Sequence, residues 1–410
     1  MLALRLTRGA QPAVQLRRLL VAAASAGTGF LLLCALGHAL GHPQDTTASL
    51  LRLAWCVPPL AATVHFAVAV ARTDPGTSPR PGLSAVGLGP ARLMLVSATT
   101  TTTLATTLGS ALALLLFLHL RGDLTGTPFT ALGTDFLATA QPLPVPATVT
   151  LLSVVPLTAS TATAWALRPH EPAGSRAAGV APDPRKDGTP PAPDRATRPP
   201  AAAPRTEQAN PLTTLPWGFT LLAAGLAVET YAAHAKTTTP VTLPGGLTAS
   251  PTGILTGWIL TALGLALTGP GLTHLTGRLL QTANPGALRL LAGRVLMAEA
   301  PRIGRPLGVV CAVVSAAYAT TALYDTSAPP FGPLTTLGAL LVTGCTVATL
   351  LTSAVEAKHA RADITGALLR LGAPATTLRG AATLRTAALL AVFAPLTLLV
   401  AELATQPLRA

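Results

Sequence analysis

The sequence is short of charged and aromatic residues, and this shortage is its first informative property. Charged side chains make up 10% of the 410 residues and aromatic side chains 4%, whereas 50% of the residues are hydrophobic. A water-soluble domain commonly carries about 25% charged residues, because its surface must stay solvated. The scarcity of charge excludes a soluble globular protein and favours a chain that lies mostly in lipid.

Acidic residues are scarcer than basic ones: 15 Asp and Glu stand against 28 Lys and Arg, which gives a net charge of +13. The basic residues form no stripe interleaved with aromatic residues, so nucleic-acid binding is not expected. The chain has only four cysteines, none of them in a C-x-x-C pair and all of them inside apolar segments. We expect these cysteines to be small buried side chains rather than metal or redox ligands.

Sequence motifs for catalysis and for nucleotide binding are also missing. The chain contains no G-x-x-x-x-G-K-[ST] phosphate loop, no G-x-S-x-G nucleophile motif and no H-E-x-x-H zinc motif. Without a phosphate loop the chain has no ordinary means of holding ATP phosphates. We therefore predict a protein that is not an enzyme and that binds no cofactor.

Apolar blocks of about 20 residues dominate the chain, and this length crosses a hydrocarbon core about 30 Å thick. The pattern predicts an all-α polytopic membrane protein with about nine transmembrane helices. The expected spans are residues 19–40, 53–71, 93–119, 145–167, 212–234, 252–274, 306–324, 333–354 and 385–404.

The basic residues indicate the orientation of these spans in a cell membrane. With the N-terminus in the cytoplasm, all but four of the 28 Lys and Arg fall in cytoplasmic segments, counting Arg385 with the loop that precedes the last span. The exceptions are Arg52, Arg121, Lys236 and Arg409. Since cytoplasmic loops are enriched in Lys and Arg, this orientation is favoured, and nine spans place the C-terminus outside the cell.

Residues 168–211 differ in composition from the rest of the chain. This segment holds eleven prolines mixed with Arg, Asp and Ala, and it has no apolar periodicity. Such a segment buries too little apolar surface to offset its ordering entropy. We predict a disordered cytoplasmic linker.

The two ends of the chain share an internal similarity. Residues 2–5 resemble residues 291–294, and both segments are amphipathic stretches that lead into a long apolar span. Residues 82–90 and 366–374 match at nearly the same offset, and each lies in a basic loop between the second and third spans of its half. The order, spacing and topology predict two parallel repeats.

The loop that follows the eighth span resembles a known family. Glu356, Lys358, Arg361 and Asp363 form a basic and acidic cluster, which is followed by the element Leu-Arg-Leu-Gly-Ala at residues 369–373. This pattern is similar to the cytoplasmic loop of FtsX/MacB-type ABC transporter permeases. In this family a leucine-arginine-x-leucine-glycine-alanine element precedes a basic helix that enters the next span.

The resemblance implies a domain layout. Residues 1–167 would form the first permease repeat, an elbow helix plus four spans, and the linker 168–211 would follow it. Residues 212–274 would be a connecting two-span hairpin, and residues 275–410 a second repeat with an elbow helix and three spans. Two departures stand out: the family's large extracytoplasmic domain is replaced by short loops, and the second repeat has three spans rather than four.

The resemblance also implies partners and a site. The chain would be the permease subunit of an ABC-type transporter in contact with membrane lipid, and a separate ABC ATPase would drive export or transmit force across the membrane. A duplicated chain could work alone or as an oligomer. The expected ATPase-coupling residues lie in the two basic loops: Arg361, Asp363, Arg370, Gly372, Arg379, Gly87, Pro90 and Arg92.

Two other functions stay open. A secondary transporter needs a polar site within the membrane, and Glu229 is the candidate residue. Lys236 and His234 follow Glu229 closely, so a pair near the membrane surface is the expected environment of its carboxylate. The short extracytoplasmic loops also suit a membrane scaffold that kept a permease architecture without transport.

Overall fold

The computed structural model describes residues 12–73, 90–123, 137, 141–168, 212–234, 241–242, 248–249, 251–282, 286–323, 332–372 and 374–409. Helices make up nearly all of this part, and a pair of two-residue antiparallel strands completes it. In chain order the elements are α2 (Pro12–Gly41), α3 (Thr46–Trp55), α4 (Val57–Thr73), α5 (Pro90–Arg121), α6 (Val145–Ala166), α7 (Leu215–His234), β1 (Val241–Thr242), β2 (Thr248–Ala249), α8 (Pro251–Gln281), α9 (Ala287–Leu323), α10 (Pro333–Ala360), α11 (Ala362–Arg370) and α12 (Ala375–Arg409).

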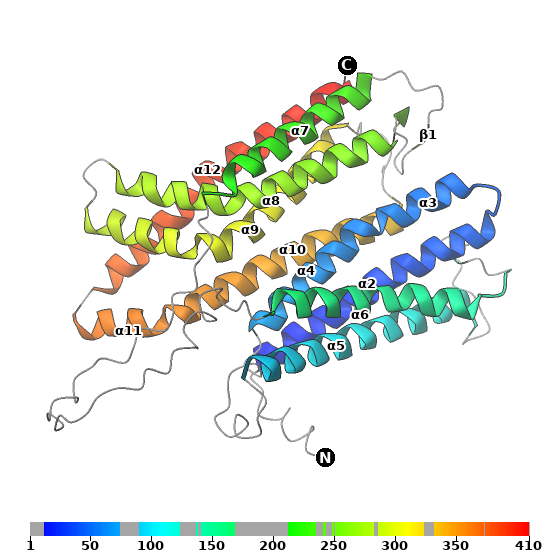
Figure 1. Cartoon of the computed structure of the whole chain (residues 1–410), viewed down its shortest axis with the longest axis horizontal. Helices are drawn as coiled ribbons and strands as arrows, with labels where there is room; N and C mark the ends of the chain where they lie inside the picture. Colours follow the sequence, from blue (N-terminus) through cyan, green and yellow to red (C-terminus); the bar gives the residue numbers. More distant parts are fainter. Residues whose placement is uncertain are drawn as a thin grey trace, which may run out of the picture.

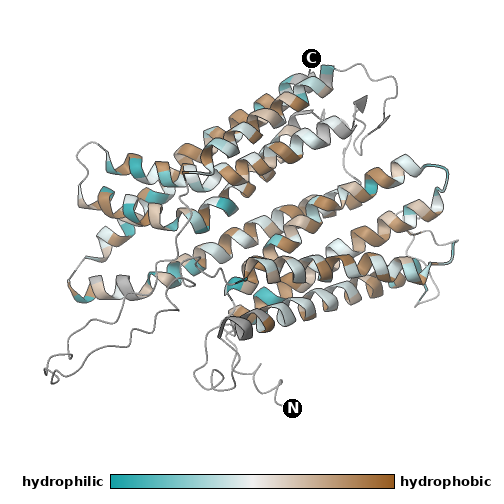
Figure 2. Cartoon of the chain, in the orientation of Figure 1, coloured by the Kyte–Doolittle hydropathy of each residue, from teal (hydrophilic) through white to brown (hydrophobic). Residues whose placement is uncertain are grey.

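Every predicted span coincides with a helix or, for residues 53–71, with the consecutive helices α3 and α4. Within the described residues, seven helical stretches are long and apolar enough to cross a membrane; α7 and α9 are not among them. In Figure 2 hydrophobic residues run along the helices, and hydrophilic residues gather at the ends of α8 and α9 that lie near α11. The chain is therefore an all-α polytopic membrane protein.

The helices form two groups that lie side by side (Figure 1). Helices α2 to α6 make up the first helix group, and α7, α8, α9 and α12 make up the second. Helix α10 lies between the groups, where it packs against α4 on one side and α9 on the other. The short helix α11 lies at one end of the bundle, called the α11 end below, where α2, α5 and α9 begin and α4, α6 and α8 finish (Figure 1).

The second elbow helix differs from the expectation. Residues 275–281 belong to α8, and residues 287–305 are continuous with the following span in the single helix α9. Pro301 and Pro306 lie inside α9 without ending it, as membrane helices tolerate when neighbouring elements compensate for the lost hydrogen bonds. The first elbow and the Pro-rich linker lie mostly outside the described residues.

Large side chains fill the centre of the first helix group. Phe30 of α2 and Phe117 of α5 are buried and meet edge to face, with ring centroids 6.2 Å apart. Leu33 and Leu152 belong to the same cluster, which joins α2, α5 and α6. This contact geometry is favourable for aromatic pairs, and it sets the separation of α2 and α5.

Glycines set the spacing of the second helix group. Gly269 of α8 and Gly304 of α9 lie so close that a Cβ on either one would collide with the backbone of the other helix. Gly277 and Gly293 repeat this contact nearer the α11 end, where a Cβ on Gly293 would lie 2.6 Å from the Gly277 carbonyl oxygen. Such small-residue contacts allow helix backbones to approach closely in a membrane, and they pack α8 along most of α9.

Candidate functional site at the α11 end

A buried carboxylate joins three helices near the α11 end. Glu299 of α9 is 9% exposed, although it lies in a helix that is otherwise apolar and basic. Its Oε1 lies 2.6 Å from Nε of Arg361, the residue between α10 and α11. Its Oε2 lies 3.7 Å from Nη1 of Arg385 on α12. Glu299 therefore connects α9 to the start of α11 and to α12.

The electrostatics of this cluster combine burial with positive charge. Burial raises the pKa of Glu299 above its ordinary value, and the nearby guanidinium groups of Arg361, Arg385 and Arg302 oppose this rise. Removing a charge from water is costly unless an opposite charge and hydrogen bonds compensate. Since two arginines reach Glu299 from other helices, the cluster resists separation of those helices.

Arg361 also determines where α10 ends. Its Nε donates to the carbonyl oxygen of Ala357 at 2.9 Å, and its own carbonyl oxygen accepts the backbone N–H of Thr365 at 2.8 Å. The first bond satisfies a carbonyl group in the last turn of α10, and the second begins α11. The residue that begins α11 is therefore also the one whose side chain contacts Glu299.

The described residues at the end of α11, Ala367, Leu369 and Arg370, are exposed. Among the described elements it makes substantial contact only with α10. Leu369 is 47% exposed and Leu371 is 84% exposed, although both are large apolar residues. Gly372 follows with φ of +88°, a conformation that side chains rarely adopt, and reverses the chain into α12. The turn and the end of α11 thus present apolar and basic residues together.

The structure places the predicted coupling residues in different environments. Arg361 is engaged within the protein by Glu299. Arg370, the last residue of α11, and Arg379, in the first turns of α12, are exposed. The side chains of Asp363, Pro90 and Arg92 and the whole of Gly87 are outside the described residues.

Glu299 is the residue that the sequence analysis did not identify. A signal was present in the sequence, because Glu299 is the only acidic residue between Arg289 and Arg305, just ahead of an apolar span. An acid at this position needs a partner, but the sequence does not say which of the many arginines supplies it. Arg361 and Arg385 are 62 and 86 positions away.

A second buried acid lies in the half of the second helix group that is farther from the α11 end. Glu229 of α7 is 3% exposed, and its Oε1 accepts a hydrogen bond of 3.1 Å from the hydroxyl of Thr261 on α8. His234 instead lies with Nδ1 2.7 Å from the carbonyl oxygen of Thr230. The expected partner His234 is thus replaced by a hydroxyl from the neighbouring helix, and Lys236 lies outside the described residues.

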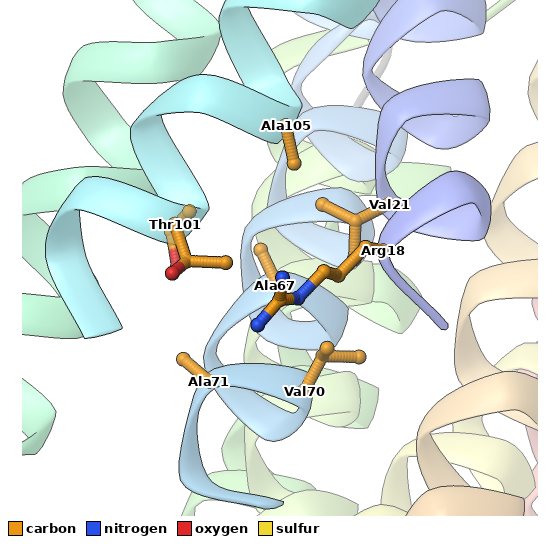
Figure 3. Close-up of a pocket in the computed structure, with 8 residues that line it drawn as sticks. Arg18, Val21, Ala67, Val70, Ala71, Thr101 and Ala105 are labelled. Atoms are coloured by element: carbon orange, nitrogen blue, oxygen red, sulfur yellow. The ribbon is translucent and has the colours of Figure 1, made fainter. Parts of the chain in front are cut away.

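A small cleft in the first helix group lies between α2, α4 and α5. Figure 3 shows the Arg18 side chain extending into it from α2, toward Ala67 on α4 and Thr101 on α5. Its cavity volume is about 10 Å³, which is room for about one water molecule. Ligand pockets usually offer about 300–1,000 Å³, so this cleft does not suit a small-molecule ligand.

The described residues also contain no group of three His, Cys, Asp or Glu placed to hold a metal ion. The four cysteines are buried and free, as the sequence predicts. His38 and His42 stack at the outer end of α2 with ring centroids 4.3 Å apart.

No protein-family model, no curated protein and no solved structure matches this chain. The likeness to FtsX/MacB-type permeases rests on the loop residues and the span arrangement described above.

Proposed function

We propose that this chain is the transmembrane subunit of an ABC-type transporter and couples ATP hydrolysis by a separate ATPase to export or force transmission. The observation that carries the proposal is α11, a short exposed helix between α10 and α12 whose first residues are tied to α9 through Arg361 and Glu299. A rigid helix at a membrane protein's cytoplasmic end can transmit a movement of a bound partner to the spans.

Matching contacts in the two halves support the two-repeat architecture of this proposal. Ser25 of α2 donates to the Thr106 carbonyl oxygen of α5 at 2.8 Å, across 81 positions. Ser315 of α9 donates to the Thr397 carbonyl oxygen of α12 at 3.0 Å, across 82 positions. Equivalent bonds at nearly equal separation favour α2 and α9 as corresponding first spans. This correspondence supports the proposal that α9 is also a membrane span.

The contact between the halves has the form expected of a duplicated permease. Helices α4 and α10, the second spans of their halves, pack against each other between the two helix groups. Thr63 of α4 lies at the centre: its hydroxyl is 2.9 Å from the Thr28 hydroxyl and 3.9 Å from Cys345 Sγ of α10. In the proposed mechanism the halves move against each other at this weakly bonded seam.

The proposed ATPase binds at the α11 end, which the distribution of Lys and Arg assigns to the cytoplasm. Arg370 and Arg379 supply exposed charge, and Leu369 and Leu371 supply exposed apolar surface. When the bound ATPase moves, α11 pulls on Arg361, and Arg361 passes the movement to Glu299 of α9. The N-terminus is then cytoplasmic and the C-terminus extracytoplasmic.

The test is co-purification of the tagged full-length chain from its native membrane in mild detergent. We expect an ABC ATPase to be recovered with the unaltered chain, and to be lost when Arg370, Leu371 and Arg379 are all replaced by Ala. Arg278→Ala is the matched control, because Arg278 is exposed in the last turn of α8 at the same end of the bundle, and α8 makes no substantial contact with α11 among the described residues. Absence of any ATPase, under conditions that preserve known complexes, contradicts the proposal.

A further inference from the structure

The acid Glu229 lies in a site formed by two helices that pack in regular antiparallel register. On α7 and α8 a glycine faces a larger residue at four successive contacts: Gly218 with Thr268, Gly264 with Leu222, Gly225 with Thr261 and Gly257 with Glu229. Two of these pairs are reciprocal. Glu229 lies over Gly257 of α8, and Thr261 lies over Gly225 of α7, one turn away on each helix.

Gly225 and Gly257 leave space for the side chains of Thr261 and Glu229 to meet, but no space for a side chain at either glycine. A Cβ on Gly257 would collide with Cγ of Glu229, and a Cβ on Gly225 would collide with the Thr261 hydroxyl. The Glu229 carboxyl group is thereby enclosed against the α8 backbone. Its Oε1 accepts the Thr261 hydroxyl, and its Oε2 is buried without a hydrogen-bond partner among the described residues.

Positive charge is scarce around this carboxyl group. On α7 the other ionisable residues are Tyr231, which is 78% exposed, and His234, which is exposed and bonds back to its own helix. On α8 no ionisable residue occurs from Pro251 to Leu272. Helix α12 also packs on α7, and its ionisable residue toward the outer end is another acid, Glu402, whose Oε1 accepts the Tyr318 hydroxyl. Lys236 and the Arg409 side chain are outside the described residues.

We propose that Glu229 is an intramembrane proton-binding site, occupied when α7 and α8 are packed as observed. Burying a charged carboxylate with only one neutral hydrogen-bond donor costs much free energy. Burying the neutral carboxylic acid costs less, because it carries no charge. A hydronium ion transfers the proton to Oε2 of Glu229, and the hydronium ion becomes a water molecule. Glu229 is five residues from the outer end of α7, about 8 Å along the helix, so water at that end is the nearest proton source. The site does not depend on an ATPase partner.

The test uses dicyclohexylcarbodiimide, an apolar reagent that enters membranes and adds to protonated carboxyl groups. The acid O–H adds across a C=N bond of the reagent to give an O-acylisourea, which rearranges to a stable N-acylurea. We expect mass spectrometry of the full-length chain in membranes to find the adduct on Glu229, and to find less adduct as pH rises. Glu299, held between two arginines, is the internal control and is expected to stay unlabelled.

A second measurement keeps the proposal testable if the reagent does not reach the site. Gln is neutral and has the shape of the protonated acid, so E229Q is expected to unfold within about 1 °C of the unaltered chain at neutral pH. Lys236→Ala is expected to leave the unfolding temperature equally unchanged. A fall of several degrees in both variants would show an ion pair in place of a bound proton, and it would overturn the proposal, as would a pH-independent adduct.

Discussion

The two helix groups solve the same packing problem with different side chains. Helices α2 to α6 contain no Asp or Glu, and hydroxyls donate several of the hydrogen bonds between them, such as Ser25 to the Thr106 carbonyl oxygen and Ser110 to the Leu152 carbonyl oxygen. The second helix group buries Glu229 and Glu299, and each acid bonds to a neighbouring helix.

This difference shows that the polar side chains of the second helix group depend more strongly on partners from other helices. A hydroxyl in a helix can always bond to its own backbone, as Thr106 does with the Thr102 carbonyl oxygen at 2.8 Å. A buried carboxyl group has no such local partner and depends on a donor or cation from another helix. Separation of the helices therefore costs more at Glu299 than at Thr106, and we place the functional sites in the second group.

The largest expected effect comes from removing the buried carboxylate of Glu299, the strongest polar contact of the second helix group. Glu299→Ala leaves Arg361 and Arg385 without their carboxylate, and loss of one partner of a buried ion pair destabilises a protein by about 3 kcal/mol. We expect a clear fall in the unfolding temperature in detergent. Glu356→Ala is the control, because this half-buried acid of α10 has no ion pair with any of the described residues. Equal effects of the two substitutions would show that the cluster is not stabilising.

The next effect concerns the glycine contacts. Gly304→Ala puts a Cβ into the backbone of α8 at Pro270, so the two helices must move apart. Overpacking of this kind costs about 2 kcal/mol. Gly344→Ala on α10 meets nothing within 4 Å and should leave stability unchanged or slightly improved. Differential scanning fluorimetry of the two variants measures the contrast, and a neutral Gly304→Ala would contradict the close approach of α8 and α9.

A smaller effect sharpens the comparison by testing where the groups are alike. Ser25→Ala and Ser315→Ala each remove one interhelical hydrogen bond to a carbonyl oxygen. Each should cost about 1 kcal/mol, as a single buried hydrogen bond does. Denaturation of both variants under identical conditions gives the two values. Unequal losses would argue against α2 and α9 as corresponding helices.

The smallest effect tests the third acid of the second group. Tyr318→Phe removes the hydroxyl that donates to Glu402 at 2.9 Å, and both side chains are partly exposed. We expect a loss of about 0.5 kcal/mol, the lower range for one hydrogen bond. The same unfolding assay measures both variants. A loss as large as that from Glu299→Ala would show that the contact of Tyr318 with Glu402, rather than that of Glu299 with Arg385, is the main polar contact between α9 and α12.

Much of the fold could be predicted from the sequence, because the length and hydrophobicity of a span are local properties. The nine predicted spans coincide with helices for this reason. The elbow before the seventh span was harder. The family resemblance implied a separate elbow helix there, but α9 is one continuous helix through Pro301 and Pro306, and glycine contacts pack it against α8.

The site could be predicted only in part. The loop pattern singled out Arg361, Arg370 and Arg379, and the structure leaves two of them exposed but engages Arg361 with Glu299. Exposure depends on which helices surround a residue, and a single sequence does not provide that. Of the two residues expected near Glu229, His234 bonds to its own helix and Lys236 lies outside the described residues, whereas the observed donor Thr261 lies on the next helix.

The sequence by itself determined that the chain is helical, apolar and suited to a membrane, since these properties follow from runs of residues with a fixed length and composition. Only the tertiary structure decided that α10 lies between the two groups, that Glu299 meets Arg361 and Arg385, and that Glu229 is enclosed against Gly257. The physical reason is that such partners are chosen by the rotation and separation of packed helices. Those quantities depend on contacts between residues far apart in the chain.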